Sequence, residues 1–351
     1  MGGLIPHNRP LITADDRAAV DAVLSSGWIA QGSAVEALEA SFVGLYGGGG
    51  ACAVSSGTAA LYLALKALGG ATGSIVAVPT YACSALLNAV YMAGAMPRVV
   101  DVLPDTFCLD PDALREHAAD ARFVIAVHTY GAAADVAALR ADGRTVIEDC
   151  CQSLGGMRGD RPLGAVGDAA IFSFYASKII TGGQGGAVWS RNVAEKVRDY
   201  RQFDGRETYD PRFNFQLTDL QAALANNQLQ RLDVIRARRA AVASAYLAAL
   251  PRGLETQRDL CALGRMAHRC VVVAPNRDVR DQLARHMQSA GVECIVPVQR
   301  FELLHRYLGL DPARYPVAER LSDTTLSLPL HLCLSDADVA KISDALAQFN
   351  P

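Results

Sequence analysis

The stretch "AIFSFYASKIITGGQGGAVWS" (residues 170–190) places one lysine, Lys178, between a continuous apolar run and a group of glycines. The apolar run at residues 169–174 predicts a buried strand, so Lys178 follows shortly after a strand end. The glycines indicate backbone that turns sharply or passes close to a site. Lys178 is then either an ordinary loop lysine, the more usual case for a single lysine, or a nucleophilic amine placed where a strand ends.

The pattern around this stretch predicts an α/β fold. A helical pattern at residues 58–68, with apolar positions three and four apart, lies among short apolar runs that read as strands. Continuous apolar strands that alternate with helices are typical of a mostly parallel sheet covered on both faces, and such sheets bind ligands at the carboxyl ends of their strands. The predicted strands are residues 75–79, 98–102, 123–128, 145–149 and 169–174.

The second half of the chain predicts a smaller domain. Residues 203–216 are polar and read as a loop, and a helical pattern follows from residue 217 to about residue 250. A second set of strand and helix patterns then extends to the C-terminus, including a helix that starts after Ser335. We therefore expect an N-terminal segment at residues 1–25, a large domain at 26–236 and a small domain at 237–351.

The composition excludes several classes of protein. Of the 351 residues, 51% are hydrophobic and 20% are charged, which allows a large core and excludes global disorder. The formal net charge of -3 gives no reason to expect a nucleic acid polymer or a membrane as partner. Without a signal peptide pattern or a bilayer-spanning run, the expected location is cytoplasmic. The nine cysteines lack metal-ligand spacing, so we expect them reduced and expect no metal site.

Three further motifs carry residues that suit one cofactor. "SSGTAAL" (residues 55–61) puts Gly57 and Thr58 at a helix start, where backbone N–H groups can hold a phosphate. "VIEDCCQSLGG" (residues 146–156) ends a strand with Asp149, an acid with no nearby Lys or Arg in the sequence, and "FNFQLTDLQAAL" puts Asn214 before a helix. Alone, each is more often a cap or turn residue. Together with Lys178 they fit pyridoxal phosphate (PLP), which needs an amine, a carboxylate for its ring nitrogen, and phosphate donors.

The order of motifs resembles the DegT/DnrJ/EryC1/StrS family of sugar aminotransferases along nearly the whole chain. The resemblance implies the aspartate aminotransferase-like fold of the fold-type I PLP-dependent transferases, with a large domain built on a mostly parallel sheet and a smaller α/β C-terminal domain. The matching segments are "VLSSGWIAQGSAVEALEASF", "SSGTAALYLAL", "VPTYACSALLNAVYMAGAMPRVVDV", "VHTYGAAAD", "VIEDCCQSLGG", "FSFYASKIITGGQGGAV", "FNFQLTDLQAAL" and "ERLSDTTLSLPLHLCLSDADV".

The resemblance also implies roles for individual residues. Lys178 matches the lysine that forms the Schiff base with the cofactor and moves a proton to and from it. Asp149 matches the acid paired with the pyridinium nitrogen, and Gln152 matches the glutamine that contacts the ring hydroxyl. Gly57, Thr58 and Ser173 match phosphate-side positions. Asn214 matches an asparagine that reaches the phosphate of a neighbouring subunit, so the resemblance implies at least a homodimer with shared active sites.

The implied activity is transfer of an amino group from an amino acid such as glutamate to a keto sugar, expected to be linked to a nucleotide, as in amino sugar biosynthesis. The segment "RFELLH" (residues 300–305) resembles one that lines the sugar side from the partner chain, which makes Arg300 and His305 candidate substrate residues. Trp28, in the N-terminal matching segment, and Tyr81 are the other two candidates.

Two departures from the family pattern keep other substrates open. Cys83 takes the cofactor-binding position where many members place a stacking aromatic ring, so that either its thiol or Tyr81 contacts the ring. Gln216 stands where an arginine is common, which removes a positive charge. A cyclitol or an antibiotic precursor is therefore an alternative substrate, and a PLP-binding regulatory protein without turnover is an alternative of another class. The family's dehydratases carry histidine in place of Lys178, which argues against that branch.

Overall fold

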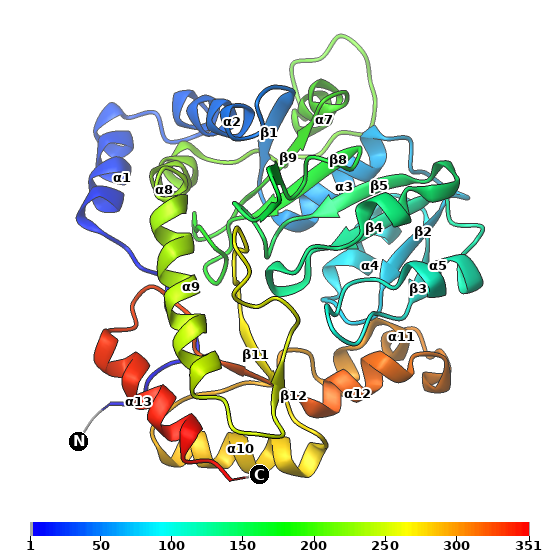
Figure 1. Ribbon diagram of the computed structural model, residues 1–351. Helices are drawn as coiled ribbons and strands as arrows, with labels where there is room; N and C mark the ends of the chain where they lie inside the picture. Colours follow the sequence, from blue (N-terminus) through cyan, green and yellow to red (C-terminus); the bar gives the residue numbers. More distant parts are fainter. Residues whose placement is uncertain (1–2, 351) are drawn as a thin grey trace.

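The computed structural model describes residues 3–350, which form two sheet-containing parts joined by the long helix α9 (Leu232–Ala248). Figure 1 shows the larger part, with most of its sheet in blue to green, above the smaller part in yellow to red. The chain crosses between them through α9 and through the N-terminal segment, which pairs with the smaller part where Ile5 bonds Gly291 and Glu293. No helix within residues 3–350 is long and apolar enough to cross a membrane.

The larger part is built on a seven-stranded sheet in the order β1-β9-β8-β5-β4-β2-β3. Neighbours from β3 through β2, β4 and β5 to β8 are parallel, and β9 is antiparallel to both of its neighbours. The strands are β1 (Gly50–Val54), β2 (Ile75–Pro79), β3 (Met96–Val100), β4 (Phe123–Val127), β5 (Thr145–Asp149), β8 (Ala169–Ser173) and β9 (Gly186–Ser190).

Both faces of this sheet are buried, which explains why its strands read as continuous apolar runs. Within β8, Ala169 and Ile171 belong to the core on one face, whereas Ala170 and Phe172 belong to the core on the other, because side chains alternate along a strand. The helices of the larger part are α2 (Ser33–Leu45), α3 (Gly57–Ala67), α4 (Ala85–Met92), α5 (Pro111–His117), α6 (Val136–Leu139) and α7 (Ala194–Arg201), with a short hairpin of β6 (Met157–Arg158) and β7 (Arg161–Pro162).

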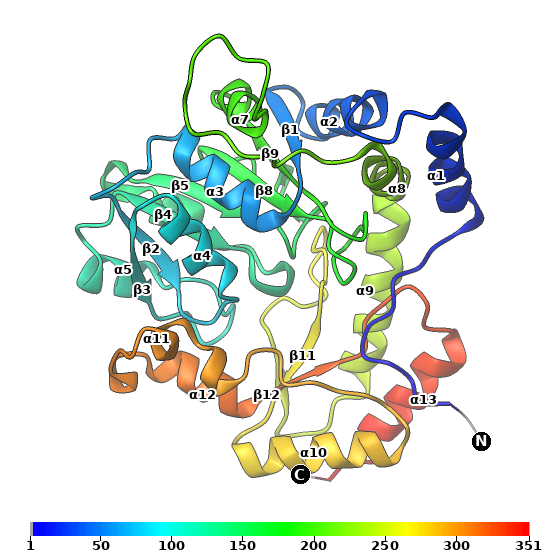
Figure 2. The ribbon, with the colours of Figure 1, turned by 180° about the vertical axis from the view of Figure 1, so that it is seen from behind.

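The smaller part has its own antiparallel sheet in the order β10-β11-β12 and its own apolar core. Figure 2 shows α10 and α13 beside this sheet, with α11 and α12 on the side nearer the larger part. The elements are β10 (Glu255–Thr256), β11 (Cys270–Val273), β12 (Thr325–Leu328), α10 (Arg277–Ser289), α11 (Leu304–Tyr307), α12 (Pro316–Thr324) and α13 (Asp336–Ala347). As predicted, Ser335 caps α13, and its hydroxyl accepts a hydrogen bond from the Asp338 N–H.

The long helix predicted from residue 217 was wrong as a single element. It is two helices, α8 (Asp219–Leu229) and α9, that change direction at Gln230 and Arg231. The Arg231 guanidinium donates to Asp16 of α1 (Ala14–Ser26) at 2.7 Å, and its backbone lies at φ -109°, ψ 16°. The sequence contains no proline or glycine at this point, so its pattern gives no signal of the break. The strand predicted at residues 98–102 also begins two residues earlier, at Met96.

Candidate active site

One cavity of about 220 Å³ opens at the carboxyl ends of four parallel strands. It collects residues that lie far apart in the sequence, because parallel strands bring their ends to the same edge of the sheet. All the residues predicted to bind the cofactor line it, except Asn214. They are Gly57, Thr58, Cys83, Asp149, Gln152, Ser173 and Lys178.

Lys178 is held in this cavity by a turn that follows β8. Its backbone N–H donates to the Tyr175 carbonyl at 2.9 Å, and Gly182 N–H returns to Phe174 at 2.9 Å. The chain has four lysines, Lys66, Lys178, Lys196 and Lys341. Of the other three, Lys66 and Lys196 donate to backbone carbonyls, and none lines this cavity. Within residues 3–350 the Lys178 ammonium forms neither a hydrogen bond nor an ion pair, so it is available to a ligand.

Asp149 ends β5, the strand next to β8, and its side chain is only 5% exposed. One carboxylate oxygen accepts the Cys151 N–H at 2.9 Å. The neighbouring Cys151 thiol is the other polar group beside this carboxylate, and no Lys, Arg or His of residues 3–350 forms an ion pair with it. Because a buried carboxylate needs a compensating donor or cation, the site fits a ligand with a protonated ring nitrogen.

Gln152 is oriented by the backbone of the loop after β4. Its Oε1 accepts the Tyr130 N–H at 2.9 Å, so the amide oxygen is already used and the amide orientation is set. The remaining NH₂ group can only donate. Since Gln152 lines the same cavity as Lys178, that donor suits an oxygen on a bound ring.

The N-terminus of α3 forms a narrow cradle at the other end of the cavity. Ser56 caps the helix by accepting the Ala59 N–H at 3.1 Å. A Cβ on Gly57 would lie 2.9 Å from the Ser173 Cβ and 3.2 Å from the Cys151 Sγ, so only glycine leaves room here. The free N–H groups of the first turn and the adjacent hydroxyls of Thr58 and Ser173 are the donors that a phosphate requires.

The glycines after Lys178 bring β9 against this cradle. A Cβ on Gly186 would lie 2.6 Å from the Ser56 carbonyl oxygen and 2.6 Å from that of Phe172. Gly185 has φ +126° and forms a bridge with Ser56. The sequence "TGGQGG" is therefore a place of close backbone approach beside the phosphate-side residues.

Two thiols, Cys83 after β2 and Cys151 after β5, also line the cavity. Cys83 is exposed and Cys151 is half-buried, and burial raises the pKa of the Cys151 thiol well above the ordinary cysteine value, so this thiol is neutral at pH 7. A neutral thiol is a soft, polarisable contact rather than a nucleophile. Cys83 lines the cofactor cavity as expected, and its contact with the cofactor ring stays a prediction.

A second cavity of about 220 Å³ adjoins the first and shares Cys83, Gln152 and Lys178 with it. Tyr81, one of the predicted substrate residues, lines this cavity, and its hydroxyl lies 3.0 Å from the Thr325 Oγ1. Several other lining residues also carry hydroxyl groups, which suit a ligand with many hydroxyls. These are Ser84, Thr129, Tyr130, Ser177 and Tyr307.

His305, a predicted substrate residue, lines neither of these two cavities in its own chain. Its side chain is fully buried, with Nδ1 2.7 Å from the Thr80 Oγ1 and Nε2 2.9 Å from a Glu319 oxygen. Its ring stacks on Tyr315 at 4.3 Å. With both nitrogens and a face engaged inside the subunit, His305 holds α11 against the end of β2, and its substrate role stays a prediction.

The other predicted residues lie outside the two cavities of this chain. Arg300 is exposed and pairs with Asp323 and, at 3.3 Å, with Glu319. Trp28 is 63% exposed and donates from Nε1 to the Gln31 carbonyl. Asn214 is exposed in the loop before α8, and its Oδ1 accepts the Gln216 N–H at 3.2 Å. Their roles therefore stay predictions.

Two basic residues of the second cavity were not predicted from the sequence. His268 and Arg269 precede β11 in a stretch with no motif. Burial, with Lys178 and Arg269 nearby, holds the pKa of His268 well below the ordinary value, so its ring is neutral. Its Nε2 lies 3.2 Å from the Ser177 carbonyl oxygen, and a neutral ring that donates there supports the turn carrying Lys178.

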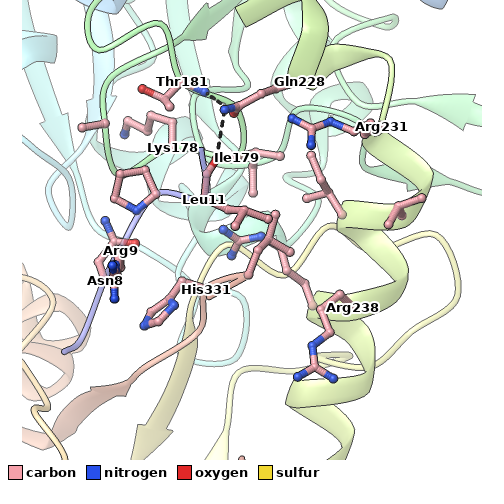
Figure 3. Close-up of a pocket in the computed structure, with 16 residues that line it drawn as sticks. Asn8, Arg9, Leu11, Lys178, Ile179, Thr181, Gln228, Arg231, Arg238 and His331 are labelled. Carbon is pink, nitrogen blue, oxygen red and sulfur yellow. Dashed lines mark hydrogen bonds between the residues drawn. The ribbon is translucent and has the colours of Figure 1, made fainter. Parts of the chain in front are cut away.

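A third cavity, of about 320 Å³, lies between the N-terminal segment, α9 and the turn after Lys178 (Figure 3). The figure shows the Lys178 side chain directed away from Arg231 and Arg238 of this cavity. Gln228 accepts the Thr181 N–H at 3.0 Å and donates to the Leu11 carbonyl at 3.2 Å, which fastens this turn to the N-terminal segment. Three of its four arginines are engaged: Arg231 with Asp16, Arg238 with Asp336, and Arg239 with three carbonyls.

The first cavity thus fits PLP at three independent points: a lone ammonium, a buried acid without a cation, and a glycine cradle at a helix start. The family model for the DegT/DnrJ/EryC1/StrS aminotransferases matches residues 10–347. That span covers nearly the whole chain, so the match is not confined to the segment around Lys178.

Solved structures agree with this match. Spr1654 from Streptococcus pneumoniae, solved in PMP and PLP forms, is 25% identical; for the PMP form the TM-score is 0.90, and 98% of this chain and 97% of that chain are covered. TlmJ, an aminotransferase from Streptoalloteichus hindustanus, is 28% identical, with a TM-score of 0.89 and 98% of each chain covered. DesV from S. venezuelae is 32% identical, with a TM-score of 0.87 and coverage of 95% and 94%.

These comparisons confirm the fold, the cofactor and the enzyme class that the sequence predicted. The α/β architecture with a seven-stranded, mostly parallel sheet and a smaller C-terminal sheet is that of the sugar aminotransferase structures. The chain belongs to the DegT/DnrJ/EryC1/StrS family of PLP-dependent aminotransferases.

Proposed function

We propose that this enzyme transfers an amino group from glutamate to a nucleotide-linked keto sugar and so produces an amino sugar. The observation that carries the proposal is the position of Lys178. Its unpaired ammonium lies where a cavity fitted to PLP meets a cavity lined by hydroxyl groups. A keto sugar has hydroxyls on most of its carbons and needs many such partners, whereas an apolar carbonyl compound does not.

Four groups of this chain hold the cofactor in the proposal. Asp149 places its free carboxylate oxygen at the ring nitrogen, and Gln152 donates its NH₂ to the ring hydroxyl. The first turn of α3 and Ser173 donate to the phosphate. When bound, PLP supplies an aldehyde that joins amines and a ring that takes up the electrons left when a carbon loses its proton.

Lys178 supplies the covalent attachment and the proton movement. Its amine has no hydrogen bond or ion pair within residues 3–350 that must break before it reacts. The turn from Tyr175 to Lys178 fixes the backbone from which the side chain extends. Once an amino donor replaces it at the cofactor, the freed amine stays beside the donor's α-carbon and can remove its proton. In the second half of the reaction the same amine would be the group placed to deliver a proton to the sugar carbon.

The proposal includes a homodimer in which each site uses residues of both subunits. Asn214 supports it, because this residue is exposed in a loop and lies outside both cavities of its own chain. Large apolar side chains are exposed on the same loop and on the loop after α1, as expected for a surface that a second subunit covers. They include Trp28, Ile29, Phe203, Tyr209 and Phe213.

The function is tested by mass spectrometry with a panel of keto sugars and nitrogen-15-labelled glutamate. The panel contains keto sugars linked to uridine or thymidine diphosphate, the corresponding free sugars and a keto cyclitol. The proposal predicts that labelled nitrogen appears in a nucleotide-linked sugar. Labelling of the cyclitol or of a free sugar alone would contradict the nucleotide-linked substrate, and labelling from another amino acid alone would contradict glutamate as the donor.

A further inference from the structure

The second cavity contains one cation that the chemistry at Lys178 leaves unused. Of its lining residues only Lys178 and Arg269 are cationic, since His268 is neutral. Arg269 is half-buried and forms no ion pair within residues 3–350. Its guanidinium lies over the Tyr130 ring, 5.8 Å from the centroid. A partly desolvated guanidinium without an acid usually serves an anion that arrives from outside.

The guanidinium is held in place by a neutral acceptor rather than by an acid. Its NH1 lies 3.3 Å from the Nε2 of His7, which is also 2.9 Å from the Ser327 hydroxyl. Burial and the charge of Arg269 lower the pKa of His7 to about 3, so His7 is neutral and offers a lone pair. The remaining N–H groups have no hydrogen-bond partner among the described residues. Arg269 is therefore fixed in position with its charge uncompensated.

Glu302, an acidic residue that lines the same cavity, does not pair with Arg269. Its carboxylate accepts the Gln299 N–H at 2.7 Å and forms no ion pair with an arginine of the described chain. Arg269 is thus a cation of this cavity that no acid of the described chain pairs with. A bidentate carboxylate is the ligand that matches the planar donor fork of an arginine.

We propose that Arg269 binds the α-carboxylate of the amino donor, with His7 holding the guanidinium in position. The inference rests on the proposed function and assigns a residue to one of its substrates. The donor's α-carbon must reach the amine of Lys178, and the carboxylate is attached to that same carbon. It must therefore lie in the same small cavity as Lys178, as Arg269 does. In a nucleotide-linked sugar the diphosphate is separated from the reacting carbonyl by the sugar ring.

The test is isothermal titration of the cofactor-loaded enzyme with glutarate, a dicarboxylate that lacks the amine and cannot react. Arg269→Gln is expected to weaken glutarate binding about tenfold or more, since charge-assisted hydrogen bonds are lost. Arg269→Lys should keep part of the affinity. Arg285→Gln is the matched control, because Arg285 is an exposed arginine of α10 outside the cavities and should leave the affinity unchanged.

A second measurement separates binding from folding. The absorbance change of the bound cofactor on addition of glutamate alone should require a higher glutamate concentration in Arg269→Gln, while the thermal midpoint stays near that of the wild type. Unchanged glutarate affinity in this variant, or no glutarate binding by the wild type, would overturn the assignment. Weaker binding of uridine diphosphate with unchanged glutarate binding would assign Arg269 to the nucleotide instead. None of these readouts depends on sugar turnover, so they remain informative if the proposed sugar substrate is wrong.

Discussion

Asp149 and Lys178 follow adjacent parallel strands and line one cavity, yet neither forms an ion pair within residues 3–350. The acid lies at the end of β5 and the amine lies five residues beyond β8. Opposite charges left unpaired in one cavity indicate that a ligand separates them. A PLP ring between the two would present its nitrogen to the acid and its aldehyde to the amine.

Asp149→Asn should retain part of the cofactor but lower the transamination rate constant by about a hundredfold or more, because an amide does not keep the ring nitrogen protonated. Cofactor content is measured by absorbance and the rate by coupled assay. A rate near that of the wild type would contradict the role of Asp149.

Glu148→Gln, at the neighbouring position on β5, should affect stability rather than chemistry. Glu148 is buried and faces away from the cofactor cavity, where it accepts hydrogen bonds from His128 Nε2 at 2.9 Å and from the backbone of Gly164, Val166 and Gly167. An amide in its place loses charge-assisted bonds worth about 1–3 kcal/mol each when one partner is left unsatisfied. Thermal unfolding should show a lower midpoint, whereas the cofactor absorbance of the folded protein should be unchanged.

The same residue predicts a pH dependence of stability. Burial raises the pKa of Glu148, but the His128 bond and the backbone donors outweigh it and hold the pKa below the ordinary value of 4.5. A carboxyl with a depressed pKa stabilises the fold above its unfolded pKa and loses that contribution as pH falls through its folded pKa. The difference in thermal midpoint between wild type and Glu148→Gln should therefore shrink below about pH 4.5. A difference that stays constant down to pH 3 would contradict this reading.

Gly57→Ala should weaken cofactor binding without unfolding the protein. The added Cβ would lie 2.9 Å from Ser173, and it would occupy the space where the cradle meets the phosphate. We expect the PLP dissociation constant to rise about tenfold, as for loss of one or two phosphate contacts. Gly44→Ala in α2 is the control, since a Cβ there has no neighbour within 4 Å; it should leave PLP affinity unchanged and raise stability slightly, because alanine is favoured over glycine in a helix.

The predicted sharing of sites between subunits can be tested by mixing inactive variants. Lys178→Ala and Asn214→Ala each remove one component of a site. If Asn214 serves the partner's phosphate, a mixed dimer contains one site that lacks both residues and one that lacks neither. Activity should return, toward a quarter of the wild-type value, when the two variants are unfolded and refolded together. No recovery above the separate variants would place Asn214 in its own subunit's site or outside any site.

The sequence predicted the parts of the fold that depend on local pattern. The strands β2, β5 and β8 read as apolar runs because both sheet faces are buried, and Lys178, Asp149 and Gly57 fall at their ends or at a helix start. The cavity itself follows, since parallel topology brings these ends together. The apolar periodicity of each element and the order of the motifs were enough to predict this part of the fold.

What the sequence could not show depends on contacts between distant segments. At the break between α8 and α9, Arg231 bonds Asp16, more than two hundred residues away. The bonds of His305 to Thr80 and Glu319, which fix its ring inside the chain, likewise have no signal in its motif. Arg269 and His7 carry no motif at all, and their relationship becomes visible only when the N-terminal segment lies beside β11.

The central claim is that Lys178 carries the cofactor, and the most direct measurement is peptide mapping after borohydride reduction of the purified enzyme. Reduction makes the lysine–cofactor bond permanent, and the four lysines of the chain are easily distinguished by mass spectrometry. The expected result is a pyridoxyl phosphate adduct on Lys178 and none on Lys66, Lys196 or Lys341. Lys178→Ala should then yield no adduct and no turnover. An adduct on another lysine of the active enzyme, or turnover in Lys178→Ala, would contradict the account.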